Sequence, residues 1–196
     1  AYNSCGLWRI PLEDLAEEAV ELRDQYNFSA VKMRLGRETT DEDIAAASSV
    51  LNAIPNTIVM SDFNQSLTYS EAVNRMRALD DLGLYWFEEP LRYSELAGCA
   101  RLSEKMRTPI MLGENFHGPR DMHEALKARA CDMVMPDLMR IGGVTGWMRA
   151  AAIAEQYSVS VSSHRMPDMA STRGVESPRR GGGVGTTGRG GRGGGP

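Results

Sequence analysis

Three carboxylates follow successive apolar segments of the sequence, each at the point where the apolar run ends. They are Asp62, Glu88 and Glu114, which follow the runs at 57–60, 84–87 and 109–113. Three hard oxygen ligands suit Mg²⁺, or Mn²⁺ as the alternative, rather than zinc, which prefers nitrogen and sulfur. Any one of them alone is better explained as a helix cap or a loop residue. Their equivalent positions in consecutive units favour one shared metal site.

The middle carboxylate lies in the stretch 84–90, LYWFEEP, where an apolar run typical of a buried strand ends in two carboxylates and a proline. Adjacent carboxylates at the edge of a core repel each other and lose hydration, which suggests a cation, a hydrogen-bond network or a helix N-terminus nearby. We interpret Glu88 as the metal ligand, whereas Glu89 could equally well serve the adjoining turn and helix start.

Two cations occupy an earlier apolar run at 29–35. Lys32 and Arg34 are two residues apart, so in a strand they point to the same side, opposite Val31 and Met33. If that side is the interior, the two cations need anions there, and a nearby metal-bound carboxylate substrate would supply one. The alternative is an exposed edge strand with solvated charges.

A histidine and an aspartate end the last two apolar runs of the sequence. His164 follows the run at 159–163, and Asp137 follows the run at 132–135. An aspartate one strand away can accept a hydrogen bond from the imidazole, hold its tautomer and raise its basicity. A lone histidine is more often structural, as we expect for His117 in a loop and His123 in a helix.

These residues are positioned by a regular alternation of strands and helices. We predict seven strands, at 2–8, 29–35, 57–60, 84–90, 109–113, 132–135 and 159–163. Six helices lie between them, at 11–20, 40–54, 71–82, 96–106, 119–130 and 144–157, with Ser70 as the N-cap of the third. The strand centres recur at roughly 25 residues, the length of one strand–loop–helix–loop unit.

Such alternation means parallel strands with right-handed crossovers, in either an open doubly wound sheet or a closed barrel. Polar residues end strand after strand, which favours a TIM-type (β/α) barrel of about seven βα units, because a barrel gathers its active site at that end. A doubly wound sheet usually concentrates its site at one switch point.

Composition indicates a soluble globular protein. The 196 residues are 42% apolar and 24% charged, and neither a membrane span nor a secretory signal peptide is visible. The three cysteines are far apart, which argues against disulfides and a thiolate metal site and favours a cytoplasmic setting. Net charge is −4, with +3 in residues 174–196 and −7 elsewhere, so nucleic-acid binding is not expected of the body.

The pattern stops after residue 173, which divides the chain into a partial barrel domain at 1–173 and a Gly/Arg-rich tail at 174–196. The tail has almost no apolar side chain to bury, so we expect it to be disordered. Its abrupt start favours a truncated or frame-shifted reading of the gene. A flexible segment that binds a partner or RNA is the alternative.

Six segments together resemble the enolase superfamily, and within it the mandelate racemase subgroup, across nearly all of residues 1–173. They are AVKMRLG, SDFNQSL, WFEEP, LGEN, MPDLMRIGGVTGW and SSH. The resemblance implies Mg²⁺-dependent abstraction of the proton α to a carboxylate, through an enediolate intermediate. It also implies residue roles: Asp62, Glu88 and Glu114 as metal ligands, Lys32 beside the substrate carboxylate, Asn64, Arg140 and more weakly Ser4 as substrate contacts, and Asp137 with His164 as the acid/base dyad.

Arg34 departs from the family pattern, because it stands where the racemase has the lysine that serves as base for one face of the substrate. Arginine stays protonated in proteins and is a poor base. With His164 as the only obvious base, we predict dehydration of a sugar acid, in which His164 also protonates the departing hydroxyl. Racemisation or epimerisation of a 2-hydroxy acid is one alternative, and a non-catalytic fragment is another.

Family members also carry an N-terminal capping domain and an eighth barrel strand, and neither is recognisable in this sequence. We therefore expect an incomplete barrel, with exposed strand edges and low stability. The resemblance implies a small-molecule carboxylate as ligand and a homo-oligomer in the full-length form.

Overall fold

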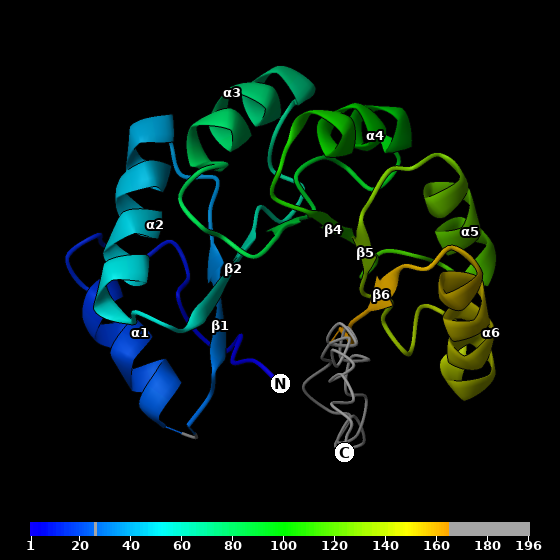
Figure 1. The fold of residues 1–196 in the computed structure, drawn as a ribbon, viewed down its shortest axis with the longest axis horizontal. Helices are drawn as coiled ribbons and strands as arrows, with labels where there is room; N and C mark the ends of the chain where they lie inside the picture. Colours follow the sequence, from blue (N-terminus) through cyan, green and yellow to red (C-terminus); the bar gives the residue numbers. More distant parts are fainter. Residues whose placement is uncertain (26, 165–196) are drawn as a thin grey trace, which may run out of the picture.

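The structure is a computed structural model and describes residues 1–25 and 27–164; the predicted tail at 174–196 lies outside them. Six strands form one parallel sheet in sequential order: β1 (Ala30–Arg34), β2 (Ile58–Asp62), β3 (Phe87–Glu88), β4 (Ile110–Leu112), β5 (Met133–Val134) and β6 (Ser160–Val161). The helices are α1 (Leu15–Asp24), α2 (Thr40–Ala53), α3 (Tyr69–Leu79), α4 (Leu96–Lys105), α5 (Pro119–Lys127) and α6 (Gly143–Gln156). In Figure 1 the helices form an arc around the outside of the curved sheet.

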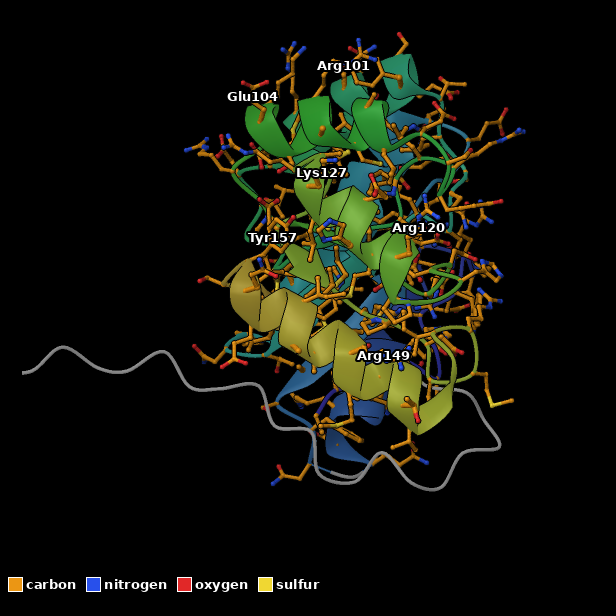
Figure 2. The ribbon with its side chains drawn as sticks, turned by 90° about the vertical axis from the view of Figure 1, so that its right-hand side faces the viewer. Arg101, Glu104, Arg120, Lys127, Arg149 and Tyr157 are labelled. Atoms are coloured by element: carbon orange, nitrogen blue, oxygen red, sulfur yellow. The ribbon has the colours of Figure 1, made fainter. Side chains whose placement is uncertain are left out.

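The predicted α/β alternation and parallel sheet are confirmed, as is the barrel-like curvature. Within the described residues β1 and β6 are the two ends of the sheet, so the barrel is not closed there. Exposed charged residues lie on the outer surface of α4, α5 and α6, and Figure 2 labels five of them: Arg101, Glu104, Arg120, Lys127 and Arg149. Val144 and Met148 of α6 are exposed as well. No described helix is long and apolar enough to span a bilayer.

The predicted strand at 2–8 is wrong, because among the described residues this segment forms a single isolated bridge with β1, between Asn3 and Val31, rather than a continuous ladder. Leu7 has a φ of 53°, which takes the backbone out of the extended region. The Leu7 N–H donates instead to the Glu18 carboxylate of α1 at 3.1 Å. The segment therefore runs beside β1, bonded to it at Asn3 and Leu7, without adding a seventh strand.

The predicted N-cap of the third helix, Ser70, is also wrong. Thr68 is the N-cap of α3, and its side chain accepts a hydrogen bond from the backbone N–H of Glu71. The Glu71 carboxylate in turn accepts from the backbone N–H of Thr68, which completes a capping box. Two reciprocal bonds outweigh the single bond that Ser70 could offer, so the helix starts earlier.

Alternation along the strands sends one set of side chains toward the helices and the other to the inside of the sheet. The first set belongs to the larger core, which includes Val31, Val59, Phe87, Leu112 and Val134. The inner set forms a separate buried cluster of Ala30, Met60, Trp86, Met111 and Met135. Two residues beyond members of this inner cluster come Lys32, Asp62, Glu88 and Asp137. The strands thus place charged groups directly above an apolar floor.

Asp80, at the C-terminal end of α3, fastens the segment that leads into β4. Its carboxylate accepts hydrogen bonds from the backbone N–H groups of Arg107 at 2.9 Å and Thr108 at 2.7 Å. Burial by itself would raise the pKa of Asp80, but these bonds outweigh it and the net shift is downward. The ionised carboxylate is therefore the form that stabilises the fold.

We expect Asp80→Ala to lower the free energy of unfolding by about 1.5–3 kcal/mol at pH 7, the range for hydrogen bonds to a charged group. Because the folded-state pKa lies below the unfolded value, this contribution is present above about pH 4 and is lost as the pH falls through the folded pKa. Urea unfolding at pH 7 and pH 3 measures the difference. Asp81→Ala, which removes only an exposed pairing with the Arg107 guanidinium, should cost about 0–1 kcal/mol. Equal losses for Asp80→Ala at both pH values would contradict this explanation.

Candidate active site

The first half of the site is a buried cluster of charges at the ends of β1, β2 and β3. Register pairs Arg34 with Asp62 and Asp62 with Glu88, so these three residues lie in a row across neighbouring strands. The Lys32 ammonium lies 2.5 Å from Glu88 Oε1 and 3.3 Å from Asp62 Oδ2. Lys32 is only 3% exposed and Arg34 only 8%. The alternative of a solvated edge strand is therefore wrong.

Glu88 is the most deeply buried member of this cluster. Burial and the negative charge of Asp62 raise the pKa of Glu88 to about 8, although Lys32 opposes the shift. Burial lowers the pKa of Lys32, but the charges of Glu88 and Asp62 outweigh it and the net shift is upward. A further donor, Trp86 Nε1, lies 3.1 Å from Glu88 Oε2. The sequence reasoning missed Trp86, although its two-residue spacing from Glu88 could have indicated a shared face.

The second half of the site centres on His164, which lies between two carboxylates. Its Nδ1 is 2.9 Å from Asp137 Oδ2, and its Nε2 is 3.0 Å from Glu114 Oε2. The other Asp137 oxygen accepts hydrogen bonds from the backbone N–H groups of Met139 and Arg140. The contact between Asp137 and His164, expected from neighbouring strand ends, is present, and the two residues also form a parallel backbone bridge.

Each member of this triad shifts the pKa of the others. Burial lowers the pKa of His164, but its hydrogen bonds with Glu114 and Asp137 outweigh burial, and the net shift is upward. The hydrogen bond from His164 lowers the pKa of Glu114. Burial would raise the pKa of Asp137, yet the His164 hydrogen bond and the two backbone donors lower it overall. As long as Glu114 holds no cation, the arrangement therefore favours an imidazolium between two carboxylates.

The three predicted metal ligands fit a hard divalent cation by donor type. Asp62 and Glu88 are partners in adjacent strands, and the charges of both Asp62 and Glu114 raise the pKa of Glu88, so negative charge accumulates there. As they stand, Lys32 contacts Asp62 and Glu88, and His164 contacts Glu114. Within the described part of the chain, no three acidic, histidine or cysteine side chains converge as a ready metal site. Mg²⁺ bound by all three carboxylates would have to displace these cationic partners.

Three predicted substrate contacts lie at the margin of the site. Asn64 is exposed, and its backbone N–H and side-chain amide both donate to Asp62, at 2.8 and 3.1 Å. Arg140 is exposed and donates from Nη1 to the Glu114 carbonyl at 2.9 Å and to Asn115 Oδ1 at 2.7 Å. Both therefore contact a predicted metal ligand. Ser4 is half-buried beside the bridge at Asn3.

Glu89 does not join the row of predicted ligands. Its Oε1 accepts a hydrogen bond from the backbone N–H of Gly113 at 2.9 Å, and its Oε2 lies 3.4 Å from the Asn115 amide. Burial raises the pKa of Glu89 to about 7. Glu89 therefore fastens the turn after β4 that carries Glu114, rather than the adjoining turn and helix start expected from the sequence.

Comparison with known protein families assigns the chain to one of them. A sequence model of the family described as enolase C-terminal domain-like matches residues 14–176. The chain belongs to the enolase C-terminal domain-like family. Among characterised family relatives, the 3,6-anhydro-α-L-galactonate cycloisomerase of Streptomyces coelicolor is 32% identical over 82% of this chain and 44% of its own length. The L-talarate/galactarate dehydratase of Salmonella typhimurium is 28% identical over 83% of this chain and 41% of its own length.

Solved structures of enolase-family proteins share the fold. An enolase from the alpha proteobacterium bal199, with bound Mg, is 50% identical with a TM-score of 0.83, over 85% of this chain and 47% of that one. An enolase from Bradyrhizobium complexed with magnesium and mandelic acid is 37% identical with a TM-score of 0.80, over 85% and 46%. The chain spans less than half the length of these relatives. The expected enolase-type barrel and the resemblance to the mandelate racemase group are thus confirmed.

Proposed function

We propose that this chain carries the acid/base and metal-binding residues of an enzyme that removes the proton α to the carboxylate of a sugar acid and eliminates the neighbouring hydroxyl. One observation carries the proposal: His164 is held by Asp137 and Glu114 at the same strand ends as the cluster of Lys32, Asp62 and Glu88. A base, a cation and three carboxylates are the groups that this reaction requires. The relatives named above include an acid-sugar dehydratase, which supports the substrate class.

In this proposal Asp62, Glu88 and Glu114 hold Mg²⁺, with Mn²⁺ as the alternative, and Lys32 neutralises the substrate carboxylate. The metal, when bound, stabilises negative charge that develops on that carboxylate. Asp137 fixes the proton on Nδ1 of His164, so Nε2 is the nitrogen that exchanges protons with the substrate. Asn64, Arg140 and Ser4 remain candidate substrate contacts.

Proton and electron movements balance in two steps. His164 Nε2 takes the α-proton, and the electron pair of the C–H bond moves into the enediolate. That electron pair then forms the carbon–carbon double bond of an enol as the C–O bond to the β-hydroxyl breaks. His164 Nε2 returns its proton to the departing hydroxyl, which leaves as water. The enol product becomes a 2-keto-3-deoxy acid, and His164 is ready for another cycle.

Arg34 supports dehydration over racemisation, because a racemase needs a base on each face and a guanidinium stays protonated. Relatives that act as epimerase or racemase are also known, such as the L-Ala-D/L-Glu epimerase of Bacillus subtilis. Incubation of acid sugars in D₂O with Mg²⁺ distinguishes the two reactions. Deuterium uptake from one epimer only, with formation of a keto acid, is expected. Rapid exchange in both epimers would overturn dehydration in favour of racemisation.

Glu88→Gln tests the proposed metal site through a stability measurement, which does not require an activity assay. A cation that binds only the folded site raises stability by mass action, by about 2.7 kcal/mol at a hundredfold excess over Kd. We expect Mg²⁺ to raise the unfolding midpoint of the parent chain and of Glu104→Gln, which alters an exposed residue of α4. Glu88→Gln should show no such shift, because a neutral amide is a weaker ligand. A parent chain that does not respond to Mg²⁺ would favour a non-catalytic fragment.

We further propose a small-molecule carboxylate as the ligand, a cytoplasmic location, and a homo-oligomer in the full-length protein. The enolase from Bradyrhizobium, which was solved with mandelic acid, supports the ligand class.

A further inference from the structure

Two equally buried arginines differ in whether their guanidinium N–H donors have hydrogen-bond acceptors. Arg34 and Arg75 are each 8% exposed. Arg75 donates to the carbonyls of Arg37, Glu38 and Thr39 and to the Asp43 carboxylate. By contrast, Nε and Nη1 of Arg34 are buried and have no hydrogen-bond acceptor among the described residues. A buried charged donor without an acceptor is costly, so its retention needs an explanation.

The Arg34 guanidinium is held in place by an aromatic ring. Its central carbon lies 4.7 Å from the centre of the Trp8 ring. The backbone N–H of Arg34 donates to the Leu7 carbonyl at 2.8 Å, which fixes the segment that carries Trp8 against the end of β1. A guanidinium stacked on a ring is held through its face, and its in-plane N–H donors stay available. Trp8 itself is 55% exposed, so the stacked pair lies at the edge of the site rather than in the core.

The unused donors lie next to the residues that hold the proposed substrate carboxylate. Arg34 is two residues beyond Lys32 on the same face of β1, and Asp62 is its register partner. The Asp62 carboxylate lies 3.3 Å from Arg34 Nε as an ion pair, but the two groups do not form a hydrogen bond. Because Lys32 already serves the carboxylate end in the proposed function, Arg34 is suited to an oxygen at another position of the same molecule.

We propose that Arg34, stacked on Trp8, binds a second oxygen group of the substrate, either a hydroxyl or a distal carboxylate, and thereby selects polyoxygenated acids. The inference rests on the proposed function and assigns Arg34 a binding role where the family pattern places a base. A hydroxyl oxygen accepts one N–H bond from the guanidinium, and a carboxylate accepts two in parallel. A 2-hydroxy acid without further oxygens would leave the two donors unused.

Arg34→Met tests this assignment through ligand binding. The variant and the parent chain are each titrated, in the presence of Mg²⁺, with three probe acids. Gluconate has several hydroxyls, tartrate has a second carboxylate, and lactate has neither group. Calorimetry should show gluconate and tartrate weakened by about 10- to 100-fold, in line with loss of a charge-assisted hydrogen bond, while lactate changes less than about twofold. A larger loss for tartrate identifies carboxylate as the preferred group, and a larger loss for gluconate identifies hydroxyl. Arg34→Lys, which keeps the charge without the fork, should recover part of the affinity.

Controls separate this role from a structural one. Arg34→Met should leave the unfolding midpoint nearly unchanged. It breaks the ion pair with Asp62, but it also removes two buried donors without a hydrogen-bond acceptor, and Asp62 keeps Lys32 as a partner. Trp8→Ala should weaken gluconate binding, whereas Tyr93→Ala, an equally exposed aromatic outside the site, should not. Equal weakening of all three acids by Arg34→Met, or none, overturns the inference and leaves the proposed function standing. A parent chain that binds no acid overturns both.

Discussion

His164→Asn should reduce α-proton exchange in a sugar acid by about 10²- to 10⁴-fold, the usual contribution of a general acid or base. The asparagine amide can still donate to Asp137, so the strand ends should keep their positions. The imidazole Nε2, which lies 3.0 Å from Glu114 in the structure, is lost as the proton carrier. Deuterium uptake in D₂O, followed by proton NMR, measures the effect.

A matched control for this variant is His117→Asn, which changes an exposed histidine in a loop. It should leave exchange unchanged. Unchanged exchange in His164→Asn would show that another residue is the base, and the proposed reaction would then be wrong. Circular dichroism of both variants, compared with the parent chain, checks that the loss is chemical rather than a loss of fold.

Arg75→Met should lower the free energy of unfolding by about 3–5 kcal/mol, because it leaves a buried carboxylate without its partner. Asp43 is fully buried, and it accepts hydrogen bonds from the backbone N–H groups of Gly36 and Arg37 as well as from Arg75 at 2.7 Å. These bonds fasten the loop between β1 and α2, which directly follows Lys32 and Arg34. The variant should therefore lose the site together with stability.

Urea unfolding followed by circular dichroism measures this loss. Arg77→Met is the control, since Arg77 lies on the same helix but is exposed, and surface changes usually cost within about 0.5 kcal/mol. Similar losses for the two variants would show that the buried pair contributes no more than a surface charge. The contrast with Arg34→Met is also informative, because Asp62 keeps Lys32 as a partner there, whereas Asp43 loses the arginine with which it pairs.

Much of the fold could be predicted from local patterns. The periodicity of apolar residues predicted all six described helices close to their observed positions. The spacing of the apolar runs predicted a parallel sheet. Two predictions failed where a local pattern was ambiguous. The strand at 2–8 was lost because Leu7 adopts a positive φ and donates to Glu18. Ser70 was displaced as the helix cap because the pair Thr68 and Glu71 forms two reciprocal bonds.

The sequence by itself determined which residue types reach the ends of the strands, because alternation along a strand depends only on neighbours two positions apart. On that basis we predicted Lys32, Asp62, Glu88, Asp137 and His164 as members of one site. Tertiary structure alone decided which of them touch. Lys32 and Glu88 are 56 residues apart in the chain, and their contact depends on strand register and burial. For the same reason, only the fold revealed the unused donors of Arg34, the stacking of Trp8 and the role of Glu89 in the turn after β4.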